Sequence, residues 1–483
     1  MRHPLTAAHS SNRLAWLEGL RILAAVMILL YHGQLLFIDY RYTPQPTGLL
    51  DNLQGLIPAQ VAPAAFWGHL LAAPTLFGFQ FVDVFVMISG FSLMLSLRQQ
   101  SLSLLPFWRR RLLRILWPFW TVAWASYPVL WAIGVATQSY VPSLWHIFAG
   151  ATFPLLFDYR GSLLLPTSGP WWFVPLIVSF TLVFPLLHWL QQRWGSRNLL
   201  FASLAVTLTY RILAIYSFGG HPTYAIFDNS NAEQPFQVFL AKLSTFVVGM
   251  VVARQYQRGQ GALFWPQTRK LTVGAGLYGV GFISQFYKLG WVFCDLLLPL
   301  GLTLLCGTMM AAIATRPTAR TVLIRAGRHS YSFFLIHNFV VDRTLNLVVQ
   351  GIGSRYVSLL LPMIALTYGL AVVADRLQPL LIRILQHLWR DLDYLLSASA
   401  PRTQQDWTPI VGDRVVYTGR TDWEILQIEI LLDDGNCYLC KITNQHQSLW
   451  VSQERLTPIT AQVPDSFTEA ALVVKNRKKP SNG

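Results

Sequence analysis

The apolar run that follows Arg21 constrains the fold of this chain more than any other stretch. Residues 14–37 read LAWLEGLRILAAVMILLYHGQLLF, and after Arg21 the clearest polar interruptions are Tyr31 and His32. As a helix this run is long enough to cross the hydrocarbon core of a bilayer, about 30 Å. The whole chain is 53% hydrophobic and only 12% charged. These features indicate a polytopic membrane protein.

Similar apolar segments recur along the first 380 residues. We predict an all-α membrane domain of about ten transmembrane helices, at roughly 14–38, 79–97, 112–134, 171–190, 198–216, 236–254, 271–287, 292–314, 330–350 and 357–376. Two shorter segments, 62–77 and 140–157, contain proline, and we expect them to be interfacial or re-entrant. The first helix lacks a cleavage site of small residues, so we expect it to stay as a signal anchor.

The charge distribution predicts orientation rather than nucleic-acid binding. Residues 1–400 hold 28 Lys and Arg against 12 Asp and Glu, whereas residues 401–483 hold 9 against 10. With a cytoplasmic N-terminus, twenty basic residues fall in inner loops and four in outer loops (Arg41, Arg160, Lys288 and Arg355). This bias predicts a multi-pass protein of the plasma (inner) membrane with both termini in the cytoplasm.

The sequence pattern changes after the last predicted span. Leu380–Trp389 suggests a helix on the inner leaflet, which completes a membrane domain over 1–390 and precedes a linker over 391–410. Short alternating segments with a turn signal at 433–436 predict a small all-β, SH3-like domain over 411–463, followed by a basic disordered tail over 464–483. This domain is a candidate binding module for a protein partner. Its single CxxC motif lacks a second ligand pair, so we predict no metal site.

Ionisable residues at membrane depth are the first candidates for function. His32 lies eleven positions after Arg21. In a helix this spacing amounts to three turns plus about 20°, so the two residues share one face and lie about 16 Å apart along the axis. Glu18 lies one turn before Arg21 on nearly the same stripe. A packing histidine beside an interfacial arginine is the alternative explanation.

Two further segments carry charge into apolar surroundings. Asp83 needs a buried partner, and we consider His32, Ser89 and the helix backbone. Arg111 and Arg114 lie one turn apart at the inner end of the third span. They suit an anionic cytosolic ligand such as a nucleotide phosphate, or they form an ordinary stop-transfer cluster.

Five motifs in order resemble the integral-membrane acyltransferase family 3, the O-acyltransferases that modify sugars, glycans and lipids. They are LEGLRILAAVMILLYH, FVDVFVMISGFSLML, FWRRRLLRILWPFW, GPWWFVPLIVSFTLVFPLL and GRHSYSFFLIHNFVV, and the resemblance covers about residues 11–380. The matching positions are Arg21 and His32, Asp83 with 89–91, Arg111 and Arg114, and Ser330, Tyr331 and His337. One departure is that 172–185 lacks the glutamate pair of many members.

The resemblance implies acyl-CoA, taken to be acetyl-CoA, as a cytosolic cosubstrate, with no bound cofactor. The acceptor is then a hydroxyl of a glycan, sugar or lipid. Arg21, Arg111 and Arg114 would hold the donor phosphates, and His32 would act as general base. A covalent acyl-histidine stays open.

Other polar residues have two possible interpretations. Arg211 and Lys242 either line an acceptor cleft or extend to the outer interface. Glu18, Ser330 and Tyr331 are possible active-site residues, and His337 is either an active-site or a packing residue. A competing function is a proton-coupled exporter of a glycan or lipid that uses His32 and Asp83 as a relay.

Overall fold

The computed structural model divides the chain into two compact units, residues 1–385 and 386–483. The structure describes residues 6–59, 72, 74–97, 103–139, 141–156, 169–217, 238–398, 411–412, 414–417, 420–431, 437–444, 447–452 and 457–458. Each unit is treated separately below.

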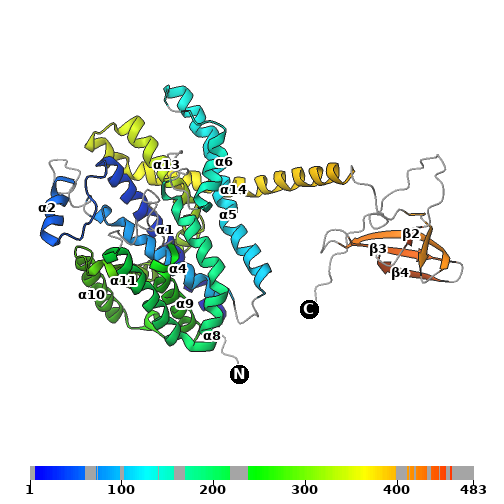
Figure 1. Cartoon of the computed structure of the whole chain (residues 1–483), viewed down its shortest axis with the longest axis horizontal. Helices are drawn as coiled ribbons and strands as arrows, with labels where there is room; N and C mark the ends of the chain where they lie inside the picture. Colours follow the sequence, from blue (N-terminus) through cyan, green and yellow to red (C-terminus); the bar gives the residue numbers. More distant parts are fainter. Residues whose placement is uncertain are drawn as a thin grey trace. The chain divides into compact units, whose positions relative to one another are not determined.

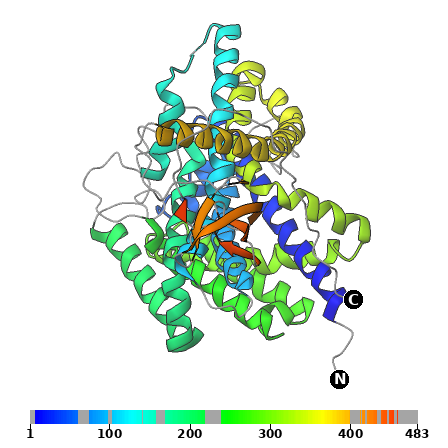
Figure 2. The ribbon, with the colours of Figure 1, turned by 90° about the vertical axis from the view of Figure 1, so that its right-hand side faces the viewer.

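The first unit is a bundle of helices (Figure 1). In chain order they are α1 (Thr6–Phe37), α2 (Leu49–Ala59), α4 (Phe81–Ser96), α5 (Leu104–Thr137), α6 (Trp145–Thr152), α8 (Phe173–Ile212), α9 (Leu243–Gln257), α10 (Gln267–Ser284), α11 (Cys294–Ile313), α12 (Pro317–Arg328), α13 (Ser330–Thr344) and α14 (Gly353–Ala398). Helix α1, blue in Figure 2, crosses the unit and packs against α4, α11, α12 and α13. It is therefore the element around which the bundle is built.

Glycine allows the closest helix contact of the bundle, between α4 and α9. An ideal Cβ at Gly90 would lie 2.1 Å from the Phe246 carbonyl oxygen, and one at Gly249 would lie 2.1 Å from the Met87 carbonyl oxygen. Only residues without a side chain permit this approach, which is how helices in membranes gain contact area.

Among the described residues, six helical stretches are long and apolar enough to cross a membrane. The predicted number of about ten is larger for two reasons. Helix α8 with its flanking turns forms one stretch that covers two predicted spans, which join at Gly195, where φ is 80°. The helices at three other predicted spans, α9 with 15 residues, α10 with 18 and α13 with 15, are not among the six stretches. The membrane character is confirmed, and the count of ten stays a prediction.

The end of the helical region differs from the expectation. The sequence predicts a separate surface helix over Leu380–Trp389, whereas α14 continues without interruption from Gly353 to Ala398. Its 46 residues correspond to about 70 Å, more than the full thickness of a bilayer. The helix also occupies the first part of the predicted linker. The predicted interfacial segment 62–77 lies mostly outside the described residues.

The second unit contains a small antiparallel sheet, as the sequence predicts. Its strands are β1 (Arg414–Tyr417), β2 (Arg420–Leu431), β3 (Cys437–Thr443), β4 (Ser448–Ser452) and β5 (Thr457–Pro458), in the order β4-β3-β2-β1-β5. Strands β2 and β3 pair with Leu431 opposite Cys437, around the predicted turn. Trp423, Ile425 and Cys440 are among its buried core residues. Closure into an SH3-like barrel and the basic tail stay predictions.

Candidate active site

Two histidines from distant parts of the chain meet inside the helical unit. His32 belongs to α1 and His337 to α13, and Nε2 of His337 lies 2.9 Å from Nδ1 of His32. Their ring centroids are 5.0 Å apart. His337 is fully buried, and His32 is partly buried. The sequence singles out both residues, but it cannot reveal their contact.

The hydrogen bonds of His32 define its free nitrogen. Nδ1 lies 3.1 Å from the Ile28 carbonyl oxygen, which can only accept a hydrogen bond. The network therefore assigns the ring proton to Nδ1 and a lone pair to Nε2. No residue in the described part of the chain pairs with Nε2. His32 thus has the protonation pattern of a general base.

His32 borders a cavity of about 410 Å³. Its wall includes carboxylate, ammonium, amide and indole groups, from Asp83, Asp295, Lys242, Gln285, Asn338, Trp172 and Trp291. A polar cavity that contains a basic nitrogen suits a polar ligand with hydroxyl groups.

A buried chain of opposite charges forms part of this wall. Lys242 Nζ lies 2.6 Å from Asp83 Oδ1 and 3.4 Å from Asp295 Oδ2. Ser89 donates instead to the Phe85 carbonyl oxygen at 2.8 Å. Asp83 thus pairs with Lys242 rather than with His32 or Ser89, the side chains that its sequence context suggests. The reason is that Lys242, from the turn before α9, offers a full charge that a neutral imidazole does not.

Arg211 adds a second cation to this buried chain of charges. Its Nη1 lies 2.9 Å from Asp295 Oδ2, and its Nε donates to the Trp291 carbonyl oxygen at 3.0 Å. Arg211 is not among the cavity-lining residues, whereas Lys242 is. Of the two residues predicted to line an acceptor cleft, only Lys242 reaches this cavity. Two cations and two carboxylates here compensate one another, as buried charges require.

Arg21 lies toward the other end of α1, where it contacts α4. Its guanidinium lies 2.6 Å from Glu18 Oε1 and donates to Ser92 Oγ at 2.6 Å. The predicted stripe of Glu18, Arg21 and His32 is thus present on α1, with the first two residues joined as an ion pair. Because Arg21 is only partly buried, its charge remains available to a ligand.

Arg111 reaches the same face of α4 from α5. It donates to Ser96 Oγ, and Ser96 follows Ser92 by one helical turn. The structure therefore brings Arg21 and Arg111 to neighbouring positions, although ninety residues separate them in sequence. Arg114 is exposed one turn further along α5. We call Arg21, Arg111, Ser92 and Ser96 the arginine cluster.

The remaining predicted site residues lie in α13. Ser330 is buried at its start. The Tyr331 hydroxyl donates to the Ile115 carbonyl oxygen of α5 at 3.2 Å. Tyr331 thus joins α13 to α5, the helix that carries Arg111. Neither Ser330 nor Tyr331 lines the cavity.

Several cavity residues are not predicted from the sequence, among them Asp295 and Asn338. Asp295 lies in the first turn of α11, and Asn338 follows His337 on α13. An aspartate inside an apolar segment is the same signal that identifies Asp83, so Asp295 was recognisable. Asn338 has no such signal, because a single amide in a helix is common.

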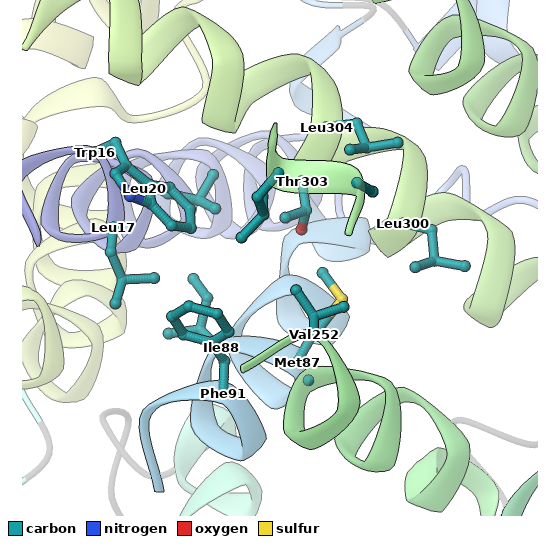
Figure 3. Close-up of a pocket in the computed structure, with 13 residues that line it drawn as sticks. Trp16, Leu17, Leu20, Met87, Ile88, Phe91, Val252, Leu300, Thr303 and Leu304 are labelled. Atoms are coloured by element: carbon teal, nitrogen blue, oxygen red, sulfur yellow. The ribbon is translucent and has the colours of Figure 1, made fainter. Parts of the chain in front are cut away.

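A second, largely apolar pocket of about 70 Å³ lies nearer the beginning of α1 (Figure 3). Trp16, Leu20, Phe91 and Leu304 line it from α1, α4 and α11, and Thr303 adds a hydroxyl group. None of its lining residues is charged, whereas the first cavity has charged groups and a histidine in its wall.

Comparison with known proteins identifies the family of the chain. A family model described as an acyltransferase domain matches residues 14–376. The O-acetyltransferases OatA of Staphylococcus aureus strains NCTC 8325 / PS 47 and COL are each 24% identical over 359 residues, which cover 66% of this chain and 55% of the relative. The chain thus spans about half the length of these relatives. No solved structure matches it. Because the family model covers most of the membrane region, the chain belongs to the integral-membrane acyltransferase family 3.

Proposed function

We propose that this protein is a membrane O-acyltransferase that moves an acyl group, taken to be acetyl, from acyl-CoA to a hydroxyl group of a glycan, sugar or lipid. The donor binds from the cytoplasm at the arginine cluster, with Arg114 beside it. The acceptor occupies the cavity at His32. This assignment places both chain termini in the cytoplasm, in line with the bias of basic residues toward the inner loops.

The observation that carries the proposal is the layout of α1. One helix holds a base at a polar cavity and, eleven residues earlier, an arginine beside a second arginine from α5. The separation of about 16 Å suits a donor whose phosphates remain near water while its thin pantetheine arm extends to His32. Guanidinium groups suit phosphates because they bind them in a bidentate manner.

The chemical step needs one proton transfer at His32. Nε2 takes the proton of the acceptor hydroxyl while the hydroxyl oxygen attacks the thioester carbonyl carbon. The C–S bond then breaks, and the thiolate of CoA leaves and receives the proton from His32. General-base catalysis of this kind contributes about 10²- to 10⁴-fold in rate.

A second route forms the same products in two steps. Nε2 first attacks the thioester carbonyl carbon, and the C–S bond breaks to release the thiolate of CoA. The acceptor hydroxyl oxygen then attacks the acyl-imidazole, the bond between the acyl carbon and Nε2 breaks, and the hydroxyl proton ends on the thiolate. Rapid quenching with labelled acetyl-CoA separates the routes, because only the second leaves label on His32 before acceptor is added.

The cavity wall supplies acceptor contacts. The carboxylate of Asp83 and the ammonium group of Lys242 accept from and donate to neighbouring hydroxyl groups. In this arrangement Asp83 binds the acceptor rather than orienting the imidazole, since its nearest charged partner is Lys242.

The competing exporter hypothesis is less well supported by the contacts. A relay through His32 and Asp83 requires the two groups to exchange protons, whereas His32 contacts His337 and Asp83 contacts Lys242. An exporter also has no need for the arginine cluster at the other end of α1.

Two experiments test the proposal. Protein in lipid nanodiscs is melted with and without micromolar CoA and acetyl-CoA, and a rise in melting temperature is expected because only ligands that bind the folded state stabilise it. Mass spectrometry then compares surface glycans and lipids of cells with and without the gene. Absence of both stabilisation and a lost acetyl mass would contradict the proposal.

A further inference from the structure

We propose that His337 is a positioning residue that holds His32 in the tautomer whose Nε2 faces the acceptor. This inference rests on the proposed function and adds a role that does not follow from the sequence. His337 does not line the cavity itself, so its effect must pass through His32.

A buried backbone contact sets the tautomer of His337. Nδ1 of His337 is in hydrogen-bond contact with the carbonyl oxygen of Phe334, one turn earlier on α13. A carbonyl oxygen only accepts, so Nδ1 of His337 carries the proton. In a neutral imidazole the other nitrogen, Nε2, must then be an acceptor.

That acceptor lies 2.9 Å from Nδ1 of His32. Two lone pairs cannot bond each other, so Nδ1 of His32 must donate, which agrees with its second contact to the Ile28 carbonyl oxygen at 3.1 Å. The Phe334 carbonyl thus sets the tautomer of His337, and His337 together with the Ile28 carbonyl sets that of His32. Within this pair, the nitrogen left with a lone pair directed away from the partner ring is Nε2 of His32.

The contact with His337 also stabilises the protonated form of His32. When Nε2 of His32 takes a proton, the ring keeps its Nδ1 proton, and the lone pair of His337 receives a stronger, charge-assisted hydrogen bond. A carboxylate usually has this function beside a catalytic histidine. Here Asp83 is bound to Lys242, and a neutral imidazole replaces it.

Packing fixes the position of His337. The residue is fully buried, and its ring lies 5.4 Å from the ring of Phe334, measured between centroids. Helices α1 and α13 pack directly against each other. The imidazole therefore acts as a rigid acceptor rather than as a group that reaches substrate.

Variants of His337 with side chains of similar size distinguish a role in positioning His32 from a role in packing. In His337→Gln the side-chain oxygen can reach the place of Nε2 and still accept from His32. In His337→Asn the amide reaches only the place of Nδ1, and in His337→Leu no acceptor remains. We expect kcat for acetyl transfer to stay within about tenfold of wild type in the Gln variant and to fall at least about 100-fold in the other two, since loss of the correct tautomer costs up to about 10⁴-fold elsewhere. KM for acetyl-CoA should stay unchanged in all three.

Val341→Ala serves as the packing control, because Val341 is a fully buried residue of α13 one turn beyond His337 and belongs to neither site. It should retain kcat near the wild-type value. Equal kcat values for the Gln, Asn and Leu variants would overturn the inference.

A measurement that does not depend on activity completes the test. Nitrogen-15 NMR of histidine-labelled protein in nanodiscs should show His32 protonated at Nδ1 and unprotonated at Nε2 in wild type and in His337→Gln. A proton on Nε2 in wild type would contradict the inference even if the enzyme is active. A wild-type protein that transfers no acetyl group yet has the expected tautomer would contradict the proposed function instead.

Discussion

At the scale of residues, one part of the site can be predicted from the sequence and the other part cannot. The stripe of Arg21 and His32 follows from helix geometry within one segment, so it can be read from the sequence. The contacts of Asp83 with Lys242 and of His32 with His337 join residues 159 and 305 positions apart. Such pairs depend on how helices pack, and a single sequence contains no direct signal for them.

The arginine cluster leads to a prediction about donor affinity. Arg111→Ala or Arg114→Ala removes a charged contact to phosphate, which costs about 1.5–3 kcal/mol, or about 10- to 150-fold in Kd for CoA. Calorimetry with CoA measures this loss, and kcat at saturating donor should change less than Kd. Arg355→Ala, in a predicted outer loop, is the matched control. Unchanged CoA affinity in both Arg111→Ala and Arg114→Ala would remove the phosphate assignment.

The Asp83–Lys242 pair leads to a prediction about stability. Lys242→Met leaves the carboxylate of Asp83 without its nearest cation, and it should destabilise the folded protein by about 3–5 kcal/mol. The double variant Lys242→Met with Asp83→Asn should recover part of this loss, because one unpaired charge is removed. Melting temperatures in detergent measure both effects. Additive losses in the double variant would show that the two side chains do not interact.

At the scale of elements, periodicity predicts where helices occur but not where they end. Gly195 lies where the apolar pattern lapses, and its non-helical φ of 80° and ψ of 162° divide α8 there into two helices joined by a kink, between the predicted spans 171–190 and 198–216. By contrast, Pro379 does not end α14, although proline often breaks helices. The β-strands were predictable because alternation and turn residues are local signals, whereas the closure of a sheet is not.

Helix packing gives a prediction at this scale. Gly90→Val places a branched side chain against the backbone of α9, where even a Cβ would be 2.1 Å from the Phe246 oxygen. We expect a clear loss of monodisperse, folded protein in fluorescence-detected gel filtration. Gly369→Ala is the control, because a Cβ there meets no atom within 4 Å. Normal folding of Gly90→Val would show that α4 and α9 are not packed as described.

At the scale of the whole molecule, the chain combines a helical membrane unit with a separate β-unit. The sheet has its own core of residues such as Trp423 and Ile425, and residues 386–483 form a distinct compact unit. A unit with its own core should not be needed to hold the helical bundle together. Its role is proposed to be binding of a protein partner, which affects where or when the enzyme acts.

Deletion of residues 401–483 tests this independence. Acetyl transfer in isolated membranes should remain within about twofold of the full-length protein per inserted molecule, because the deletion begins beyond α14 and removes no residue of the cavity or arginine cluster. Quantitative blotting provides the normalisation. A complete loss of transfer in a normally inserted truncation would mean that the β-unit contributes to the site.

The most direct test of the account concerns His32 alone. Wild type and His32→Ala are compared in nanodiscs for acetyl transfer and for CoA binding. If His32 is the base, the variant should lose transfer by at least about 100-fold while its Kd for CoA stays unchanged, since the arginine cluster is intact. Wild-type turnover in His32→Ala would contradict the account, and His32 would then be a packing residue.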